Sequence, residues 1–333
     1  MAFRICVIGC GALSTRAHGP SYRRYADRHP DVELAACCDL DAARTEAYRV
    51  AFGFGRAYVD FRAMLDTERP DAVCLMAPVD KTCELSCAVM KMGFPLLMEK
   101  PPGLDREQCM KMIAAAEASG VANQVAFNRR YVPLVRHLKQ DLDRRCPPED
   151  IQYLRYDFFR MNRRDTDFST TAIHGIDTVR FLAGSPYRRI RFRYQELDHL
   201  GFGVANLYLD CEMASGAMAY LDFCPVTGVL IERATVNAYD QTWFLEIPLW
   251  GAFDAPGRLL CVTQGTVTEE VDGGLLEGAE QMHIASGFYD ENASFFDDLR
   301  AGRRPVGDIR SGLQSVEIAA CLRSRRAEYV AAT

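Results

Sequence analysis

The chain has 333 residues, of which 49% are hydrophobic and 25% charged, and its formal net charge is −6. This length favours two domains over one, and no apolar stretch approaches the ~20 residues of a membrane-spanning helix. The slight acidity argues against nucleic acid as a partner, because such proteins concentrate basic residues on one face.

The first residues form an apolar run without the basic region and cleavage site of a signal peptide, which predicts a cytoplasmic protein. The thirteen cysteines are an odd number and include no Cys-x-x-Cys. Many lie in apolar runs, where a reduced cysteine behaves as a small hydrophobe. We therefore expect neither a disulfide framework nor a metal site.

The first 125 residues alternate short apolar runs with helical stretches, which predicts a doubly wound parallel sheet. Gly53, Gly93 and Gly120 follow three of the helices, at positions typical of a left-handed cap. Gly19-Pro20 predicts a late start or a kink in the first helix. The expected strands are 4–8, 33–37, 72–75, 95–98 and 123–126, and the expected helices are 42–52, 82–92 and 106–119.

Residues 126–333 are expected to form a second, α+β domain with a large, open, mostly antiparallel sheet. Its apolar residues alternate in part with polar ones, which leaves one face for solvent or a partner. The two closing helices could return to pack between the domains. The expected strands are 151–161, 189–196, 204–213, 217–223, 230–238, 242–248 and 259–271, and the helices are 171–182, 289–301 and 308–325.

A glycine turn follows the first strand, where dinucleotide-binding folds hold a pyrophosphate against a helix N-terminus. Gly9 permits the tight turn and Gly11 the close approach of the backbone, whereas Ser14 replaces the third glycine of the fingerprint. The alternative is an ordinary turn, but the position at the first strand–helix junction favours a nucleotide site. The candidate phosphate-binding residues are Gly9, Gly11, Ala12 and Leu13.

Asp39 and Asp41 follow the second strand, where a carboxylate can bind both adenosine ribose hydroxyls and would repel a 2′-phosphate. Arg44 is the nearest arginine on the C-terminal side. This pattern favours NAD over NADP. The alternative is that Asp39 only caps the next helix.

Lys100 follows the fifth strand within Glu99-Lys100-Pro101, at the sheet edge where open α/β folds bind ligands. There it could hydrogen-bond a reacting hydroxyl and stabilise the alkoxide, although Lys-Pro also occurs in surface turns. His174 and Asp177 share one face of an expected helix, and an imidazole can accept a hydroxyl proton near neutral pH. A locally satisfied histidine is the alternative.

Six segments, in this order, resemble the glucose–fructose oxidoreductase/inositol dehydrogenase (Gfo/Idh/MocA) family. They are the glycine turn, Met76-Ala77-Pro78, Glu99-Lys100-Pro101, residues 127–133 (FNRRYVP), His174-Gly175-Ile176-Asp177 and residues 295–305 (FFDDLRAGRRP). The resemblance implies an NAD(P)-binding Rossmann domain, a sugar or polyol substrate, and a homodimer or tetramer formed through the open sheet.

The resemblance also implies roles for single residues. Lys100 matches the catalytic lysine, with a cis bond to Pro101, and His174 matches the base or proton relay. Arg130 lies near the substrate pocket. The residues that would line the nicotinamide half are Ala77, Pro78, Glu99 and Asn128, with Thr82 where relatives often have a histidine.

One departure concerns the histidine. Relatives commonly have an aspartate where this chain has Thr170, so the proton relay must run through His174 alone or use another acid. Asp165, Asp167 and Asp177 are the candidates.

The segment 158–168 carries donors suited to polyol hydroxyls or to the carboxylate of a sugar acid; an exposed charged loop is the alternative. The predicted substrate-binding residues are Arg130, Arg160, Asn162 and Asp177.

The leading hypothesis is an NAD-dependent oxidoreductase that acts on a secondary hydroxyl of a sugar, sugar acid or cyclitol. In it Lys100 polarises the hydroxyl and His174 accepts its proton. The alternatives are a lyase or glycosidase in which bound NAD oxidises the substrate transiently, and a non-catalytic sensor of nucleotide and ligand.

Overall fold

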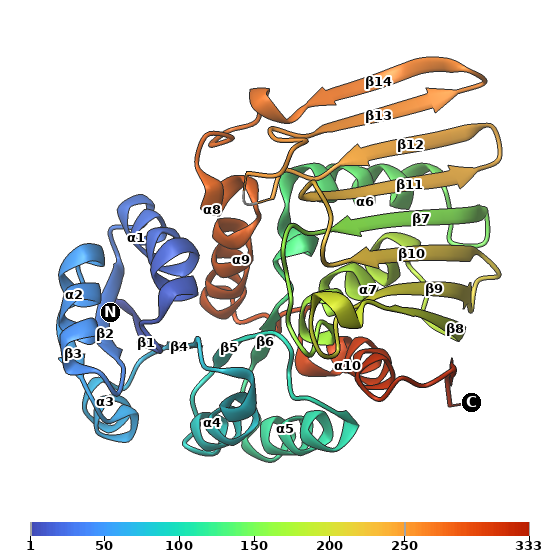
Figure 1. The fold of residues 1–333 in the computed structure, drawn as a ribbon. Coiled ribbons are helices and arrows are strands. Elements are labelled where there is room, and N and C mark those ends of the chain that lie inside the picture. The colour runs from blue at the N-terminus through green and yellow to red at the C-terminus, as the bar shows by residue number, and fades with distance from the viewer. Residues whose placement is uncertain (1, 250, 333) are drawn as a thin grey trace. The chain divides into compact units, whose positions relative to one another are not determined.

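The computed structural model describes residues 2–249 and 251–332, which form two compact units (Figure 1). The first unit comprises Met1–Asn128 and Gly287–Val316, and the second comprises Arg129–Ser286 and Glu317–Thr333. The division therefore falls once after the sixth strand, once before helix α9 and once within helix α10. Among the described residues, no helix is both long and apolar enough to cross a membrane.

A six-stranded parallel sheet forms the centre of the first unit, in the order β3-β2-β1-β4-β5-β6. The order reverses between β1 and β4, which is where open α/β sheets bind ligands beyond the strand ends. All five expected strands are confirmed, two of them with the same bounds. The strands are β1 (Phe3–Ile8), β2 (Val32–Cys38), β3 (Arg56–Tyr58), β4 (Ala72–Leu75), β5 (Leu96–Glu99) and β6 (Asn123–Ala126).

The helices of the first unit also follow the expected pattern, and Gly53, Gly93 and Gly120 have positive φ angles, as expected after helix ends. Strand β3 and helix α3 were not anticipated. The C-terminal helix α9 packs on α1, where the Tyr25 hydroxyl donates to Asp297 Oδ1 at 2.6 Å. The helices are α1 (Gly19–Arg28), α2 (Ala42–Phe52), α3 (Phe61–Glu68), α4 (Val79–Lys91), α5 (Arg106–Ser119) and α9 (Phe288–Arg300).

The expected distortion at Gly19-Pro20 is confirmed. A π-helical turn, η1 (Ser14–His18), precedes α1, and Pro20 lies in the first turn of the regular helix, where its missing N–H costs no hydrogen bond. Such π-turns are frequent at functional sites.

The second unit is built on a nine-stranded sheet in the order β14-β13-β12-β11-β7-β10-β9-β8-β15. Its neighbours pair antiparallel except for β7 and β10, which are parallel. The large, mostly antiparallel sheet is therefore confirmed. Its strands are β7 (Ile151–Phe159), β8 (Tyr187–Glu196), β9 (Ala205–Met213), β10 (Met218–Cys224), β11 (Ile231–Ala238), β12 (Gln241–Glu246), β13 (Arg258–Thr263), β14 (Thr266–Asp272) and β15 (Glu328–Val330).

One expected strand is wrong. Residues 259–271 form a hairpin of β13 and β14, because Gln264 and Gly265 both take positive φ angles, 48° and 79°, and reverse the chain. Such a tight turn matches the twist of the flanking strands.

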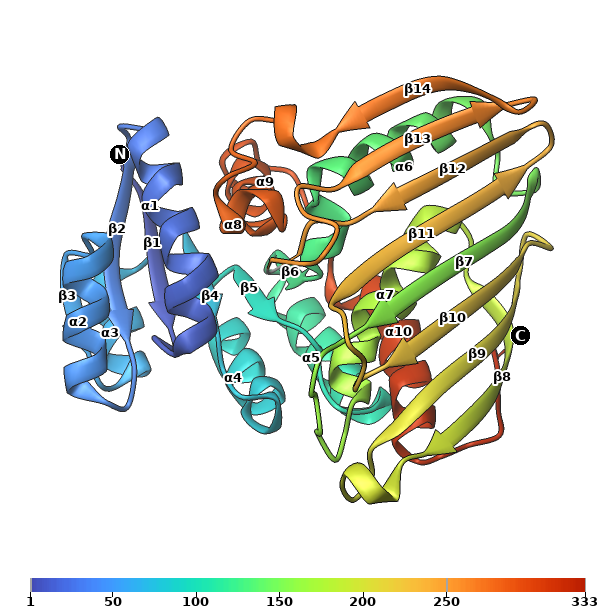
Figure 2. The same ribbon diagram turned by 45° about the horizontal axis from the view of Figure 1, so that its top comes forward.

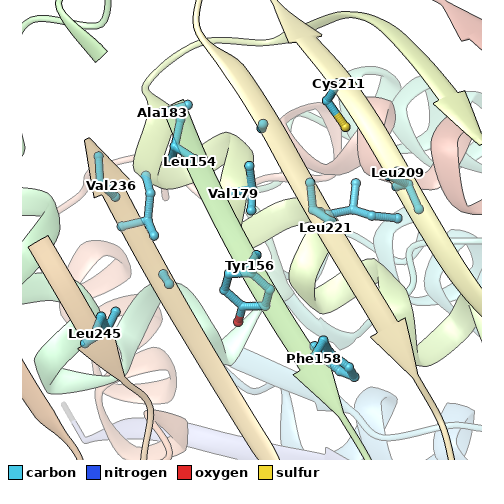
Figure 3. Packing of buried hydrophobic residues seen from close by; sticks show 14 of the residues in the cluster. Leu154, Tyr156, Phe158, Val179, Ala183, Leu209, Cys211, Leu221, Val236 and Leu245 are labelled. Carbon is cyan, nitrogen blue, oxygen red and sulfur yellow. The ribbon is translucent and has the colours of Figure 1, made fainter. Parts of the chain in front are cut away.

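Helices cover one face of this sheet, as Figure 2 shows for α6, α7 and α10. Buried and partly exposed residues alternate along β9 throughout its length. The buried face packs on the helices through residues such as Tyr156, Val179 and Leu221 (Figure 3). The remaining helices are α6 (Pro133–Arg145), α7 (Ser169–Ala183), α8 (Met282–Ala285) and α10 (Ile309–Arg323), with 3-10 turns η2 (Asn128–Tyr131), η3 (Asp198–Leu200) and η4 (Gly273–Leu275).

Candidate functional site

The glycine turn lies at the carboxyl end of β1. Gly9 has a φ of 99°, and a Cβ built on it would lie 2.2 Å from the carbonyl oxygen of Met76, so this position requires glycine. A Cβ on Gly11 would meet no atom within 4 Å. The backbone at Gly11 thus faces open space, as close approach by a pyrophosphate requires, and Ala12 and Leu13 continue from it.

Asp39 holds the turn in place from the end of β2. Its Oδ2 accepts a hydrogen bond from the backbone N–H of Cys10 at 2.9 Å. Its Oδ1 accepts one from the backbone N–H of Asp41 at 3.1 Å and one from Arg44 Nη1 at 3.2 Å. The side chain is 13% exposed. A carboxylate has about four acceptor positions, so Asp39 retains capacity for a ligand hydroxyl.

The alternative role for Asp39 as a helix cap is wrong. Asp41 is the N-cap of α2, and its Oδ1 accepts the backbone N–H of Arg44 at 3.0 Å. Asp39 therefore does not cap α2.

Ser14, in the third position of the fingerprint, is buried and donates its hydroxyl proton to the Tyr48 hydroxyl on α2 at 2.9 Å. This bond joins the π-helical turn that follows the glycines to α2. The residue that departs from the fingerprint therefore makes a hydrogen bond that a glycine could not make.

The segment after β4 begins helix α4 directly. Ala77 precedes Pro78, which occupies the N-cap position, and the Thr82 hydroxyl donates to the Pro78 carbonyl oxygen at 3.2 Å. Thr82 is buried and its hydroxyl serves the first turn of the helix, so its place on the cofactor side stays a prediction.

The Glu99-Lys100-Pro101 segment has the expected cis peptide bond between Lys100 and Pro101. Glu99 Oε2 accepts the backbone N–H of Lys100 at 3.1 Å. The other oxygen, Oε1, lies 2.9 Å from His18 Nε2. The buried carboxylate therefore links the backbone of the lysine to a histidine 81 positions earlier in the chain.

His18 was not anticipated from the sequence. It is fully buried, and its Nδ1 lies 3.2 Å from the Nδ2 of Asn292, which is fully buried on α9. Because an amide nitrogen can only donate, His18 Nδ1 accepts a hydrogen bond from Asn292, and the protonated Nε2 donates one to Glu99. The chain Asn292–His18–Glu99 thereby connects α9 to the start of the lysine segment. Asn128, at the end of the unit, is also buried.

His174 and Asp177 lie on α7 in the second unit, and both are buried. Asp177 is held by Arg130, whose Nε and Nη2 donate to the two carboxylate oxygens at 2.7 and 2.5 Å. This two-pronged pair is the strong geometry for an arginine and a carboxylate.

The other two candidate acids also pair with arginines. Asp165 accepts from Arg163 at 2.8 Å and Asp167 from Arg323 at 2.7 Å. The contact that the structure gives for the His174 ring is instead with Arg129, whose Nη1 lies 3.4 Å from Nε2.

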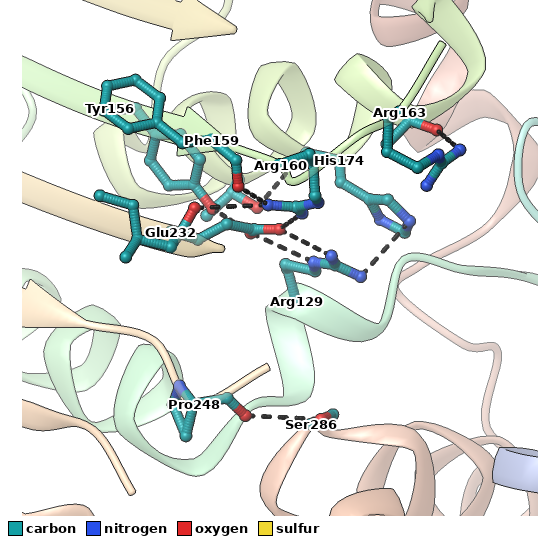
Figure 4. A network of polar contacts seen from close by, with 12 residues as sticks. Arg129, Tyr156, Phe159, Arg160, Arg163, His174, Glu232, Pro248 and Ser286 are labelled. Carbon is teal, nitrogen blue, oxygen red and sulfur yellow. Dashed lines mark hydrogen bonds and ion pairs between the residues drawn. The ribbon is translucent and has the colours of Figure 1, made fainter. Parts of the chain in front are cut away.

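A buried ionic network surrounds that contact (Figure 4). Glu232 on β11 is fully buried and pairs with both Arg129 and Arg160, and it accepts the Tyr156 hydroxyl at 2.8 Å. The Arg160 guanidinium also lies 3.7 Å from the ring centre of Phe158. No role was predicted for Glu232, Tyr156 or Arg129. Arg129 lies in the 127–133 segment, but only its neighbour Arg130 was assigned a role there, and no local motif marks the other two.

The predicted substrate-binding residues thus differ in surroundings. Arg130 and Asp177 hold each other, and Arg160 holds Glu232. Asn162 lies in an exposed turn with a φ of 50°, and its Oδ1 accepts from Arg164 at 2.9 Å. Their contact with substrate stays a prediction.

All thirteen cysteines are free thiols. Burial, with the neighbouring Cys83, raises the pKa of Cys87 to about 11, so this thiol is protonated at neutral pH. Among the described residues, no group of three or more His, Cys, Asp or Glu side chains is placed to hold a metal ion.

The doubly wound sheet, with its glycine turn after β1 and an aspartate after β2, has the architecture of a dinucleotide-binding fold, and it is joined to an open-sheet unit. Residues 3–127 match the model of an oxidoreductase family with an NAD-binding Rossmann fold, GFO_IDH_MocA. These residues belong to that family, and the resemblance is confirmed over this part of the chain.

Two curated relatives match parts of the chain. D-glucoside 3-dehydrogenase of Escherichia coli (strain K12) is 28% identical over 139 residues, which cover 42% of this chain and 38% of the relative. D-apiose dehydrogenase of Paraburkholderia graminis is 32% identical over 134 residues, which cover 40% and 34%. The aligned segment therefore spans little more than a third of the length of these curated relatives.

The fold of the whole chain is shared more widely. The crystal structure of a dehydrogenase from Chromobacterium violaceum matches with a TM-score of 0.82 at 20% identity, covering 98% of this chain and 96% of that one. At this identity the likeness establishes the fold.

Proposed function

We propose that the protein is an NAD-dependent oxidoreductase that acts on a secondary hydroxyl of a sugar, sugar acid or cyclitol. The observation that carries the proposal is the placement of three features at the carboxyl edge of one parallel sheet. They are the open glycine turn after β1, Asp39 after β2, which does not cap a helix, and Lys100 after β5. The names of the matched relatives, D-glucoside and D-apiose dehydrogenase, support the substrate class.

The residues present fit an NAD molecule. The open space at Gly11 suits the pyrophosphate, and the remaining acceptor position of Asp39 suits a ribose hydroxyl. When bound, the nicotinamide accepts a hydride from the carbinol carbon. The residues that would hold the adenosine and pyrophosphate half are Gly9, Gly11, Ala12, Leu13 and Asp39, and those that would line the nicotinamide half are Ala77, Pro78, Thr82, Glu99 and Asn128.

Two residues would act on the substrate hydroxyl. The Lys100 ammonium would donate a hydrogen bond to its oxygen and stabilise the negative charge that develops there. The His174 imidazole would accept the hydroxyl proton. The backbone of Lys100 is already fixed through Glu99 and His18, and the ring of His174 is buried in contact with Arg129.

The test is a panel of sugars, sugar acids and cyclitols incubated with NAD, with NADH followed by absorbance and products identified by mass spectrometry. We expect a substrate that yields NADH and ketone in equal amounts. Product formed without net NADH would instead show transient oxidation, as in a lyase or glycosidase. Binding of NAD and a sugar without turnover of any compound would show a sensor.

We also propose a homodimer or tetramer formed through the sheet of the second unit. The face opposite α6, α7 and α10 carries no helix in Figure 2, and polar residues such as Arg155 and Thr235 lie along it. Sedimentation velocity should give at least twice the monomer mass, and Thr235→Arg in the centre of the face should lower it. A wild-type monomer at micromolar concentration would contradict the proposal.

A further inference from the structure

We propose that Glu232 is a positioning residue for His174, acting through Arg129. In this arrangement the buried carboxylate of Glu232 holds the Arg129 guanidinium, which in turn orients His174. Thr170, which stands where relatives commonly have an aspartate, has no carboxylate for this role. The inference rests on the proposed function, in which His174 accepts the substrate proton. All the residues involved belong to the second unit.

The geometry of Arg129 directs one nitrogen to each partner. Its Nε and Nη2 donate to the two oxygens of Glu232, at 3.3 and 2.7 Å. This two-pronged bond fixes the plane of the guanidinium. The third nitrogen, Nη1, then lies 3.4 Å from Nε2 of His174 (Figure 4). The orientation that Glu232 imposes on the fork is therefore what brings Nη1 to the imidazole.

Glu232 is itself held rigidly. It is fully buried, the Tyr156 hydroxyl donates to its Oε2 at 2.8 Å, and Arg160 donates to its Oε1. Burial alone would raise the pKa of Glu232, but the charges of Arg129 and Arg160, with the hydrogen bonds from Arg129 and Tyr156, hold it below its usual value. The carboxylate is thus ionised at neutral pH and anchors both guanidinium groups.

The contact with Arg129 favours a particular state of His174. A guanidinium stays protonated and can only donate, so it favours an imidazole whose Nε2 carries no proton. The same positive charge disfavours the imidazolium ion. Arg129 therefore both orients the ring and favours its neutral form. The one lone pair of that ring is on Nε2, so the substrate proton goes to Nε2, and the 3.4 Å contact with Nη1 gives way as the proton is accepted.

Other charged and polar groups lie on the elements that carry His174 and Glu232. Tyr156 lies on β7, and Arg160 directly follows that strand. Arg160 forms an ion pair with Glu232, and the Tyr156 hydroxyl donates to the same carboxylate. On α7, Asp177 is paired with Arg130 and lies 3.7 Å from Arg180. The substitutions below leave Asp177 and its arginines unchanged, so any effect they have comes from the Glu232 network.

The experiment is a double-mutant cycle of Glu232→Gln and Arg129→Gln. Two quantities are measured: the pH midpoint of the His174 ring signals by NMR in the ligand-free protein, and kcat and KM across pH. The His174 signals are assigned by their loss in His174→Gln. Glu212→Gln, at an exposed position of β9, is the matched control.

We expect Arg129→Gln to raise the His174 midpoint by about one pH unit, because a cation next to the ring has been removed. The acidic limb of log(kcat/KM) should move to higher pH with it. Glu232→Gln should lower kcat about tenfold at pH 7 with little change in KM. In the Arg129→Gln background, Glu232→Gln should have little further effect on either quantity, since its action runs through Arg129.

Additive effects of the two substitutions would overturn the inference, as would an unchanged midpoint in Arg129→Gln. If Glu232→Gln fails to fold, Tyr156→Phe removes one hydrogen bond to Glu232 without changing charge and should lower kcat in the same way to a smaller extent; no effect there would also count against the inference. Should the wild-type protein turn over no compound, the proposed function fails, whereas the NMR cycle still tests the coupling.

Discussion

Replacing Lys100 with methionine should lower kcat about a hundredfold to a thousandfold and leave the Kd for NAD nearly unchanged. The reason is that methionine keeps the length and apolar stem of the side chain but removes the donor to the reacting oxygen. The loss of one well-placed donor at a developing oxyanion typically has this cost. Binding of NAD depends instead on the glycine turn and Asp39. Stopped-flow turnover and fluorescence titration with NAD measure the two quantities separately.

The matched control is Lys91→Met, which makes the same chemical change in the last turn of α4. It should retain full turnover. Lys100→Arg should also remain slow, because a planar guanidinium cannot place a proton where the ammonium did. Turnover close to wild type in Lys100→Met would refute the role of this lysine, whatever the reaction proves to be.

Much of the first unit's fold could be predicted from the sequence, because strands such as β4 are buried throughout and three of its helices are followed by a glycine with a positive φ angle. The strand at 72–75 and the helix at 106–119 were predicted with the bounds observed. Strand β3 was missed because its three residues, Arg56–Tyr58, lie at the sheet edge and are largely exposed. Without an apolar run, an edge strand carries no periodic signal.

Helix α6 was missed for a different reason. Only its first residue, Pro133, lies in the 127–133 segment, and no helix was predicted after it, although proline favours the first helical positions. The hairpin at β13 and β14 was merged into one strand because Gln264-Gly265 is not among the common turn dipeptides. Both errors concern a short local feature, a proline at a helix start and a two-residue turn, which the sequence pattern alone did not identify.

The candidate site was predictable where motifs are local and not where partners are distant. The turn at Gly9 and Gly11, and Asp39 after the second strand, follow from chain order within one strand–helix–strand unit. Glu232 is 103 residues from Arg129, and Asn292 is 274 residues from His18. Each became identifiable only when sheet pairing and helix packing brought it to its partner.

These distant partners share one property. Each is a buried polar side chain bonded to a residue beside a predicted catalytic group: His18 to the glutamate before Lys100, and Glu232 to the arginine beside His174. Burying such groups costs free energy unless their hydrogen bonds are made. In both networks these hydrogen bonds fix the orientation of the group next to the predicted catalytic residue.

Asp39→Ser should change the cofactor preference, measured as the ratio of kcat/KM for NAD to that for NADP, by about a hundredfold or more towards NADP. The substitution removes a charge-assisted bond to a ribose hydroxyl, worth about 1.5–3 kcal/mol. It also removes the repulsion of a 2′-phosphate. Arg44, which now lies 3.2 Å from Asp39, loses that partner and can pair with the phosphate.

Two further variants separate these effects. Asp41→Ser keeps an N-cap for α2 and should alter the ratio far less, although Asp41 contributes some of the negative charge. Asp39→Ser combined with Arg44→Ser should lose activity with NAD without gaining it with NADP, because neither the ribose acceptor nor the phosphate partner remains. A wild-type preference for NADP, or an unchanged ratio in Asp39→Ser, would show that Asp39 serves the glycine turn through Cys10 and not the ribose.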